Sequence, residues 1–302
     1  MFFIFSFFFL VLESIIFASS PSTQKELPFV IIVPSYNNTD WVEKNLKSIL
    51  TQNYSNYRII YINDNSTDET LKQVKLIALS HLQKTGLLFK ELSPQETKQF
   101  QVKQTGKNKP KKPFFTLINN QKRKGALCNI YKGVSLCEDK EIIALLDGDD
   151  WLYDNNVLSK LNKIYQETSV WLTHGNLLEY PYGGATWGEP IPPSIIRQNA
   201  FREFKCPSHL RTFYAWLFKK IKLEDLMYQG DFFEMTSDQA IMFPMIEMAG
   251  DRHLFIEEVL YVYNMKNPIN DNKIDPQKQR DLEAIIRSAP PYKRLEAAPN
   301  LN

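Results

Sequence analysis

Two continuous apolar runs, FVIIVP at residues 29–34 and RIIYI at residues 58–62, place the strongest constraint on the fold. Runs of β-branched residues without polar alternation are typical of strands that are covered on both faces. Residues 42–50 and 71–82, which follow the two runs, carry apolar side chains at helical spacing. This strand–helix–strand–helix order predicts a parallel sheet with right-handed crossovers. Ser66 and Glu69 form a predicted capping box for the second helix.

The same rhythm continues to about residue 265. Further strands are predicted at residues 114–118, 142–146, 170–173 and 259–263, and further helices at 126–136, 155–165, 211–221 and 237–249. Residues 84–113 are rich in Gln and Lys and read as a solvated loop, and residues 180–193 as a loop long enough to lie over a site. We therefore expect one domain at residues 27–265 and a polar surface tail at residues 266–302.

Composition restricts the partners only slightly. The chain of 302 residues is 43% apolar, which is sufficient for a substantial core, and its net charge of +2 offers no broad basic field. We expect no nucleic-acid partner. The cysteines are three in number and lack a close framework, which favours reduced thiols.

The N-terminus is a separate segment, MFFIFSFFFLVLESIIFASS. Its apolar run from Phe2 to Leu12 is shorter than the roughly 20 residues of a membrane span, and Glu13 interrupts it. The small residues at 18–20 suit signal cleavage. Residues 1–20 are therefore predicted to be a signal peptide or an N-terminal membrane anchor.

The stretch IIALLDGDDWLYD at residues 142–154 ends a buried strand in acidic residues. In open parallel sheets, ligands bind at the carboxyl ends of the strands. One carboxylate there would suffice to cap a helix, but Asp147, Asp149 and Asp150 lie within four residues and repel one another unless a cation sits among them. Oxygen ligands of this kind indicate Mg²⁺ or Mn²⁺.

Other acidic or phosphate-binding motifs do not fit. A calcium-binding EF-hand counted from Asp147 would need Gly and Glu where Leu152 and Leu158 stand. A Walker loop is absent. The turn after the first strand, PSYNNTD, contains no glycine, which argues against a nucleotidyltransferase.

Four segments in this order, VIIVPSYNN, IIYINDNSTDET, RKGALCNIYKG and ALLDGDDWL, resemble glycosyltransferase family 2 over about residues 29–264. The resemblance implies an α/β fold of the GT-A type, a Rossmann-like three-layer α/β/α arrangement with a mainly parallel sheet. It also implies a metal-dependent, inverting hexosyl- or N-acetylhexosaminyltransferase. Such an enzyme moves a sugar from a nucleotide-diphosphate donor, usually linked to UDP, to a hydroxyl group of a glycan, lipid or protein acceptor.

The resemblance also implies roles for residues in the donor site. Pro34, Tyr36 and Asp64 would line the nucleotide pocket, with Asp64 accepting a hydrogen bond from the base. Arg123 or Lys124 would lie near the diphosphate, and a plain surface charge is the alternative for both.

The acidic cluster resembles the Asp-x-Asp pair of the family. Asp147 would lie near the ribose or the metal, Asp149 would bind Mn²⁺ or Mg²⁺, and Asp150 would support them. A divalent ion held in this way stabilises the negative charge that grows on the leaving diphosphate.

The expected catalytic base is Asp238, in GDFFEMTSDQAIMF, with Glu234 and Asp231 as rivals. His209 and Arg211 are predicted to contact the acceptor. The alternative to an enzyme is a catalytically inactive GT-A-fold protein that binds sugar or nucleotide.

Three sequons, at Asn37, Asn53 and Asn65, bear on the location of the protein. Two of them flank the expected nucleotide pocket, where a glycan would block it. We therefore expect a membrane-associated protein whose catalytic domain faces the cytosol. Export through a cleaved signal peptide is the alternative.

Overall fold

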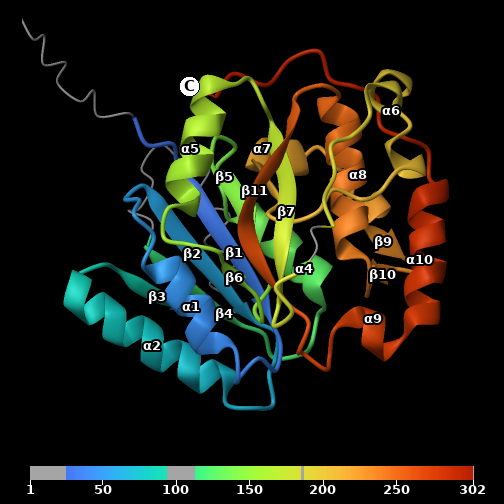
Figure 1. The fold of residues 1–302 in the computed structure, drawn as a ribbon. Helices are drawn as coiled ribbons and strands as arrows, with labels where there is room; N and C mark the ends of the chain where they lie inside the picture. The colour runs from blue at the N-terminus through green and yellow to red at the C-terminus, as the bar shows by residue number, and fades with distance from the viewer. Residues whose placement is uncertain (1–24, 94–112, 185–186, 302) are drawn as a thin grey trace, which may run out of the picture.

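The computed structural model describes residues 25–93, 113–184 and 187–301 (Figure 1). The predicted signal peptide or anchor lies outside the described residues, and so does most of the Gln- and Lys-rich stretch. Within the described ranges no helix has the length and apolar character needed to cross a membrane. Membrane association and a cytosol-facing location therefore stay predictions.

A nine-stranded sheet forms the centre of the molecule, in the order β3-β4-β2-β1-β5-β8-β7-β11-β6. Its strands are β1 (Phe29–Ser35), β2 (Tyr57–Asn63), β3 (Phe89–Leu92), β4 (Phe115–Asn119), β5 (Ile142–Leu145), β6 (Trp151–Leu152), β7 (Leu172–Tyr180), β8 (Thr212–Tyr214) and β11 (His253–Asn264). β8 runs antiparallel to β5 and β7, and β6 runs antiparallel to β11, while the other pairings are parallel. The predicted α/β fold with a mainly parallel sheet is confirmed.

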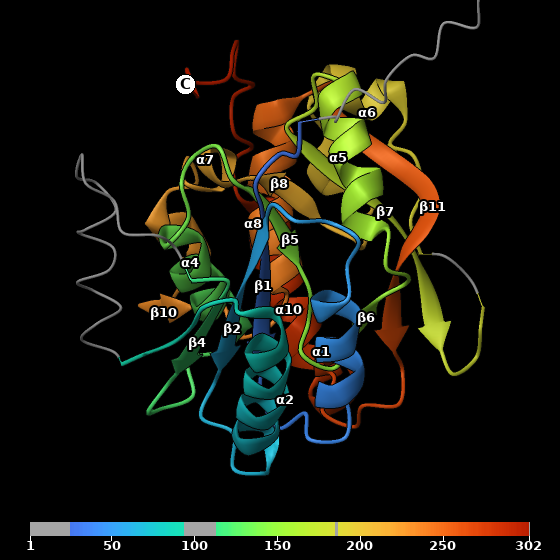
Figure 2. The ribbon, with the colours of Figure 1, turned by 90° about the vertical axis from the view of Figure 1, so that its left-hand side faces the viewer.

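The remaining elements surround this sheet (Figures 1 and 2). The helices are α1 (Val42–Leu50), α2 (Thr70–Thr85), α4 (Ala126–Ser135), α5 (Val157–Glu167), α6 (Pro193–Gln198), α7 (Ala215–Phe218), α8 (Ser237–Ala249), α9 (Asp271–Ile274) and α10 (Pro276–Ser288), with 3₁₀ turns at Phe201–Glu203 and Leu223–Leu226. A separate hairpin pairs β9 (Met227–Tyr228) with β10 (Asp231–Phe232).

Alternate side chains of β1 fill two separate cores. Ile31 and Val33 pack with the apolar faces of α1, α2 and α5, whereas Val30 and Ile32 pack with α4, α7 and α8. This division follows from the two-residue period of a strand. On the second side Gly133 of α4 lies so close to β1 that an added Cβ would be 2.8 Å from a methyl carbon of Ile32. The C-terminal half of α4 is thus packed closely against the sheet.

The predicted helix at residues 211–221 was wrong in its first part. Residues 212–214 form β8, which inserts between β5 and β7, and the helix that follows covers only residues 215–218. A short apolar run fits a buried strand and a buried helix equally well, so its period alone could not decide. The pairing partners of β8 lie far away in the sequence.

The prediction of a polar surface tail after residue 265 was also wrong. α10 packs its Leu282 and Ile286 into the core that contains α8, and each is only 4% exposed. Arg202 donates two hydrogen bonds to the buried Glu247 of α8, at 2.5 and 3.0 Å, and Tyr292 donates its backbone amide to the same carboxylate at 2.8 Å. The C-terminal segment is therefore part of the folded unit.

The predicted capping box at the start of α2 does not form. The helix begins at Thr70, whose backbone amide donates to Asp68 Oδ1 at 3.0 Å. Ser66 Oγ instead accepts from the backbone amide of Asn37 at 3.0 Å. Ser66 therefore ties the turn after β2 to the turn after β1, beside the carboxyl edge of the sheet.

Candidate active site

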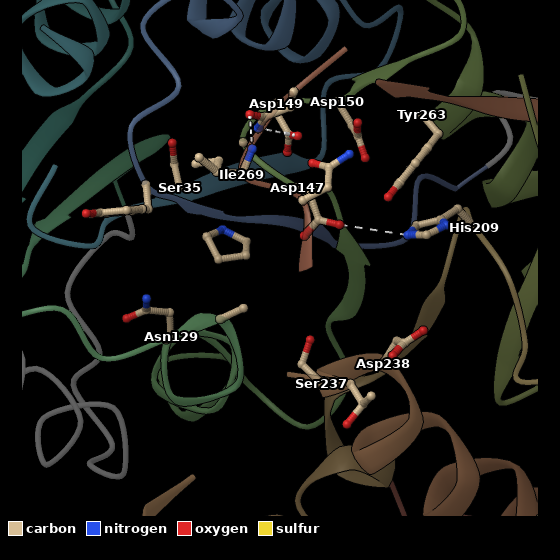
Figure 3. Close-up of a pocket in the computed structure, with 18 of the residues that line it drawn as sticks. Ser35, Asn129, Asp147, Asp149, Asp150, His209, Ser237, Asp238, Tyr263 and Ile269 are labelled. Atoms are coloured by element: carbon tan, nitrogen blue, oxygen red, sulfur yellow. Dashed lines mark hydrogen bonds and ion pairs between the residues drawn. The ribbon is translucent and has the colours of Figure 1, made fainter. Parts of the chain in front are cut away.

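A pocket of about 500 Å³ opens at the carboxyl ends of β1, β2 and β5 (Figure 3). The turns after these strands form one side of it, the first turns of α4 and α8 form others, and β11 and the C-terminal segment close it. Nine of the residues proposed from the sequence line this pocket, namely Pro34, Tyr36, Asp64, Arg123, Asp147, Asp149, His209, Arg211 and Asp238. Whether each of them has its expected role stays a prediction.

The acidic loop after β5 is held rigidly against its neighbours. Gly148 lies so close to the turn after β1 that an added Cβ would be 2.5 Å from Cβ and Oγ of Ser35. The Nδ2 group of Asn45, in α1, donates to the carbonyl oxygens of Asp147 at 3.0 Å and Asp150 at 2.8 Å. These contacts fix the direction in which the carboxylates leave the loop.

Asp150 is the structural member of the acidic cluster. Its side chain is buried, and it accepts hydrogen bonds from Tyr261 Oη at 2.5 Å and from the backbone amide of Asn264 at 2.7 Å. Burial, with the negative charges of Asp149 and Asp147 as further causes, raises the pKa of Asp150 well above its ordinary value. Asp150 therefore joins the acidic loop to β11, and its support of a metal-binding pair stays a prediction.

Asp147 and Asp149 are the members that remain available to a ligand. The side chain of Asp147 is 47% exposed. Burial acts to raise the pKa of Asp147, but the contact with His209 and the positive charge of Arg211 outweigh it and hold that pKa below its ordinary value. Asp149 Oδ2 accepts from Asn267 Nδ2 at 2.7 Å, a contact that comes from the C-terminal segment.

The donor set of this carboxylate pair fits a divalent ion that binds together with a phosphate ligand. Within the described part of the chain no group of three or more His, Cys, Asp or Glu residues could hold a metal ion. Mg²⁺ usually binds through one or two carboxylates and takes its other ligands from substrate phosphates and water. Asp147 and Asp149 therefore suit a Mg²⁺ or Mn²⁺ ion that takes its other ligands from a diphosphate and water. They suit less well a closed site in which the protein supplies every ligand.

Asp64 organises the side of the pocket formed by the turns after β2 and β4. Its buried carboxylate accepts hydrogen bonds from the backbone amides of Lys124, at 2.9 and 3.0 Å, and Gly125, at 2.8 Å. Asn120 Nδ2 donates to the same carboxylate at 2.8 Å. Asp64 thus holds the turn that precedes α4, a role that the sequence did not predict. Its contact with a nucleobase stays a prediction.

The turn held by Asp64 presents Arg123 to the pocket. The guanidinium carbon of Arg123 lies 4.1 Å from the centre of the Tyr36 ring, within the range of a cation–π interaction. Of the two basic residues considered for the diphosphate, Arg123 lines the pocket and Lys124 does not. The turns after β1 and β4 therefore supply one aromatic and one cationic group side by side.

Asp238 lies in the first turn of α8, with its side chain 35% exposed. Arg211 Nη2 donates to Asp238 Oδ2 at 3.1 Å, and the backbone amide of Gln239 donates to Oδ1 at 2.9 Å. Glu234 lines the same pocket but is 69% exposed and paired with Lys278, whereas Asp231 does not line it. Asp238 and Glu234 therefore both line the pocket with a cationic partner each, Asp238 is the less exposed of the two, and the assignment of the base stays a prediction.

His209 and Arg211 connect Asp238 to the acidic loop. Arg211 Nη1 lies 2.7 Å from His209 Nε2, which in turn lies 3.8 Å from Asp147 Oδ2. The two residues are 6% and 8% exposed, and Arg211 also donates to the carbonyl oxygen of Pro207 at 2.9 Å. Their observed contacts position other site residues, and contact with an acceptor stays a prediction.

Two other histidines, His174 of β7 and His253 of β11, do not line the pocket. Their Nε2 and Nδ1 atoms lie 3.3 Å apart, and burial lowers the pKa of His174 to about 3 and that of His253 to about 4. Both are neutral near pH 7. They join two parallel strands.

Sequence reasoning missed Asn267 and the two tyrosines of β11, Tyr261 and Tyr263. Asn267 lies in the segment that was read as a tail, and nothing in its local pattern marks it as a site residue. The tyrosines occur in an ordinary strand pattern, so only the register of β11 beside the acidic loop reveals them.

Comparisons with known proteins were made with the sequence and with the fold. Residues 30–86 match the family model of glycosyl transferase family 2. The uncharacterized glycosyltransferase RP339 of Rickettsia prowazekii is 43% identical over 61 residues, covering 20% of this chain and 18% of the relative. An uncharacterized glycosyltransferase of Haemophilus influenzae is 26% identical over 146 residues, covering 48% of this chain and 45% of the relative. The chain thus spans less than half the length of either relative.

The fold is similar to that of solved glycosyltransferases. Residues 1–349 of TarS from S. aureus, in complex with UDP, match with a TM-score of 0.55 and 14% identity, covering 86% of this chain and 65% of TarS 1–349. The mannosyltransferase PcManGT from Pyrobaculum calidifontis, in complex with GDP-Man and Mn²⁺, matches with a TM-score of 0.53 and 16% identity, covering 87% and 63%. These two matches confirm the GT-A type of fold.

Proposed function

We propose that this chain, a GT-A-fold protein with the sequence signature of glycosyltransferase family 2, is a metal-dependent, inverting glycosyltransferase. Its donor would be a nucleoside diphosphate sugar, with UDP as the expected nucleotide, and its acceptor a hydroxyl group. The observation that carries the proposal is that Asp147, Asp149 and Asp238 line one pocket at the carboxyl edge of the sheet. The structural neighbours are consistent with it, since one is in complex with UDP and the other with GDP-Man and Mn²⁺.

The donor would occupy the side of the pocket formed by β1, β2 and β5. Arg123 and Tyr36 would contact the nucleotide. Asp64 keeps the turn that carries Arg123 in place through the amides of Lys124 and Gly125. Asp147 and Asp149 would hold Mn²⁺ or Mg²⁺, which, when bound, neutralises the charge on the leaving diphosphate. The buried Asp150 and Asn45 keep the two carboxylates in position.

The acceptor would enter from the side of α8. Asp238 would take the proton from the acceptor hydroxyl as its oxygen bonds to the anomeric carbon, and the bond from that carbon to the phosphate oxygen breaks. The electron pair of the broken bond stays on the β-phosphate. One displacement of this kind inverts the configuration of the sugar. Arg211 would hold Oδ2 of Asp238 and so fix the orientation of the carboxylate.

A screen of nucleotides tests the donor site directly. A ligand that binds only the folded state raises the melting temperature. UDP, GDP and other nucleoside diphosphates, each with and without Mn²⁺, should therefore differ in how far they raise the melting temperature. We expect the largest rise with UDP and Mn²⁺. If no nucleotide raises the melting temperature, the donor-site assignment is wrong.

The metal role has its own test. Asp149→Ala should abolish both hydrolysis of the donor and transfer while the melting temperature stays close to that of the wild type. Asp154→Ala is the matched control, because Asp154 lies in the same segment but bonds to Lys160 and Asn156 outside the pocket. Full activity of Asp149→Ala, or of the wild type in excess chelator, would contradict the proposal. Binding without turnover would favour an inactive sugar- or nucleotide-binding protein.

A further inference from the structure

An aromatic pair lines the side of the pocket away from the nucleotide. Trp187 follows β7, Tyr263 belongs to β11, and their ring centres lie 4.8 Å apart with the rings tilted by 57°. Trp187 is 41% exposed, whereas Trp171 and Trp216, which pack against each other in the core, are 6% and 2% exposed. The indole of Trp187 is therefore not fully covered by neighbouring side chains.

The position of Trp187 is fixed although its ring is exposed. Its Nε1 group donates to Glu179 Oε1 at 2.6 Å, at the end of β7. The next residue, Gly188, lies so close to β7 that an added Cβ would be 2.0 Å from the carbonyl oxygen of Gly175. With its N–H group bonded to Glu179, the indole can offer a ligand only the face and edge of its ring. A rigid, exposed aromatic face beside a pocket is a preformed stacking surface.

The strand order separates this surface from the donor groups. Tyr36 and Asp64 follow β1 and β2, and the acidic pair follows β5. Trp187 follows β7 and Tyr263 belongs to β11, and both of these strands lie on the other side of β5 and β8. A nucleobase at Tyr36 and Arg123 would therefore leave the aromatic pair uncovered. Asp147 and Asp149 lie between the nucleobase position and the aromatic pair.

The groups around the aromatic pair suit a molecule that is apolar on one face and polar at its edge. Asp147, Asp238 and Glu234 line the same pocket, and Lys205, which lines it too, pairs with Glu189 at 3.0 Å. A pyranose ring has this character, since its C–H groups form a face that stacks on an aromatic ring and its hydroxyl groups radiate to hydrogen-bond partners. A hydrocarbon chain would lie against these charged groups at a desolvation cost.

We propose that Trp187 and Tyr263 form an acceptor subsite that binds a pyranose ring, so that the acceptor is a carbohydrate. This inference rests on the proposed function. It assigns to an aromatic pair the acceptor contact that the sequence had placed on His209 and Arg211. It commits to a glycan among the glycan, lipid and protein acceptors expected.

Binding of methyl glycosides tests the subsite without requiring catalysis. Methyl α- and β-glycopyranosides of glucose, galactose, mannose and N-acetylglucosamine are added to the whole protein in the presence of UDP and Mn²⁺, and binding is measured by saturation-transfer NMR. We expect at least one glycoside to bind the wild type, and Trp187→Ala to weaken that binding by at least about tenfold. Trp187→Phe keeps an aromatic ring and should stay within about threefold.

Tyr182→Ala is the matched control, because Tyr182 lies in the same connection after β7 and is 73% exposed but does not line the pocket. It should bind the glycoside as the wild type does. Equal binding by Trp187→Ala and the wild type, or no binding of any glycoside by the wild type, overturns the subsite. Melting temperatures of all variants exclude a folding defect as the cause.

A transfer assay with the same glycosides distinguishes the two proposals. If the wild type neither hydrolyses nor transfers from any nucleotide sugar but still binds a glycoside through Trp187, the proposed function fails and the subsite stands. If the wild type transfers sugar and Trp187→Ala has an unchanged KM for the glycoside, the subsite fails and the function stands.

Discussion

Replacement of Asp238 by Asn is the sharpest test of the catalytic assignment. The exchange keeps the size of the side chain and the oxygen that accepts from the backbone amide of Gln239 at 2.9 Å, but removes the charge and the ability to take a proton. A general base typically contributes about 10²–10⁴ in rate, which corresponds to roughly 3–5 kcal/mol of activation free energy. We therefore expect kcat for transfer to fall by about two to four orders of magnitude.

The same exchange has a smaller effect on the free energy of unfolding. Arg211 is 8% exposed and loses the charged partner that now lies 3.1 Å away, but it keeps its bonds to the carbonyl oxygen of Pro207 and to His209. Complete loss of a buried ion pair costs about 3–5 kcal/mol. Because Asp238 is itself 35% exposed and Arg211 keeps two partners, we expect about 1–2 kcal/mol.

The assay compares initial rates of transfer with nucleotide affinity and with stability in urea. Glu234→Gln is the control for the rival base, and we expect it to retain at least one tenth of the wild-type kcat because its carboxylate is 69% exposed and bonded to Lys278. The reasoning is refuted if Asp238→Asn keeps more than one tenth of kcat with normal nucleotide binding. A loss of a hundredfold in Glu234→Gln alone would move the base to Glu234.

Asp64→Asn should weaken nucleotide binding at least tenfold, because an amide NH₂ group would then face the backbone amide of Lys124. Calorimetry with UDP measures the affinity, and an unchanged affinity contradicts the role of Asp64. A chain that ends at residue 265 should lose nucleotide binding and cooperative unfolding, since it lacks Asn267 and the buried side chains of α10; a sharp urea transition equal to that of the full chain argues against this. His174 and His253 have pKa values of about 3 and 4 in the fold against 6.5 unfolded, so protonation favours unfolding. Stability should be intact above pH 6.5 and fall by about 3 kcal/mol or more towards pH 4, and His253→Gln should flatten that fall in urea titrations.

The first half of the sheet could be predicted because each element carries its own pattern. β1 and β2 are continuous apolar runs, and α1 has its buried side chains at helical spacing, so neither needs information from distant residues. The acidic loop was recognisable for the same reason, since three carboxylates stand within four residues. Local patterns of this kind follow directly from side-chain periodicity.

The parts that could not be predicted depend on contacts between distant segments. Thr212 and Phe213 form a strand only because β5 and β7 lie on either side of them. The hydroxyl groups of Thr173 and Thr212 contact each other between β7 and β8, although the two residues are 39 positions apart in the sequence. Arg211, predicted to contact the acceptor, donates to Asp238 of α8, which lies 27 positions later in the sequence. In each case the sequence shows a side chain of suitable type but not the partner that it meets.

The same reason explains the partial reading of Asp64. An acidic residue after a strand suits both a cap and a ligand contact. The structure shows that it binds the amides of Lys124 and Gly125, 60 and 61 residues later. Asp154, by contrast, accepts from the backbone amide of Asn156 just before α5, a contact between near neighbours in the sequence.

The contribution of α10 and Asn267 to the pocket sets an order of events during synthesis. Among the described residues, 29–264 contain the whole sheet, whereas Asn267, which contacts Asp149, and Gln279, which lines the pocket, are made after it. At about 5–20 residues per second, the ribosome needs about 1–5 s to add residues 266–288, up to the end of α10. During that interval the face of α8 that later meets Leu282 and Ile286 is uncovered. A nascent chain therefore holds all four segments of the family resemblance before it can form the complete pocket, and the segment with Asn267 and α10 decides when that pocket becomes competent.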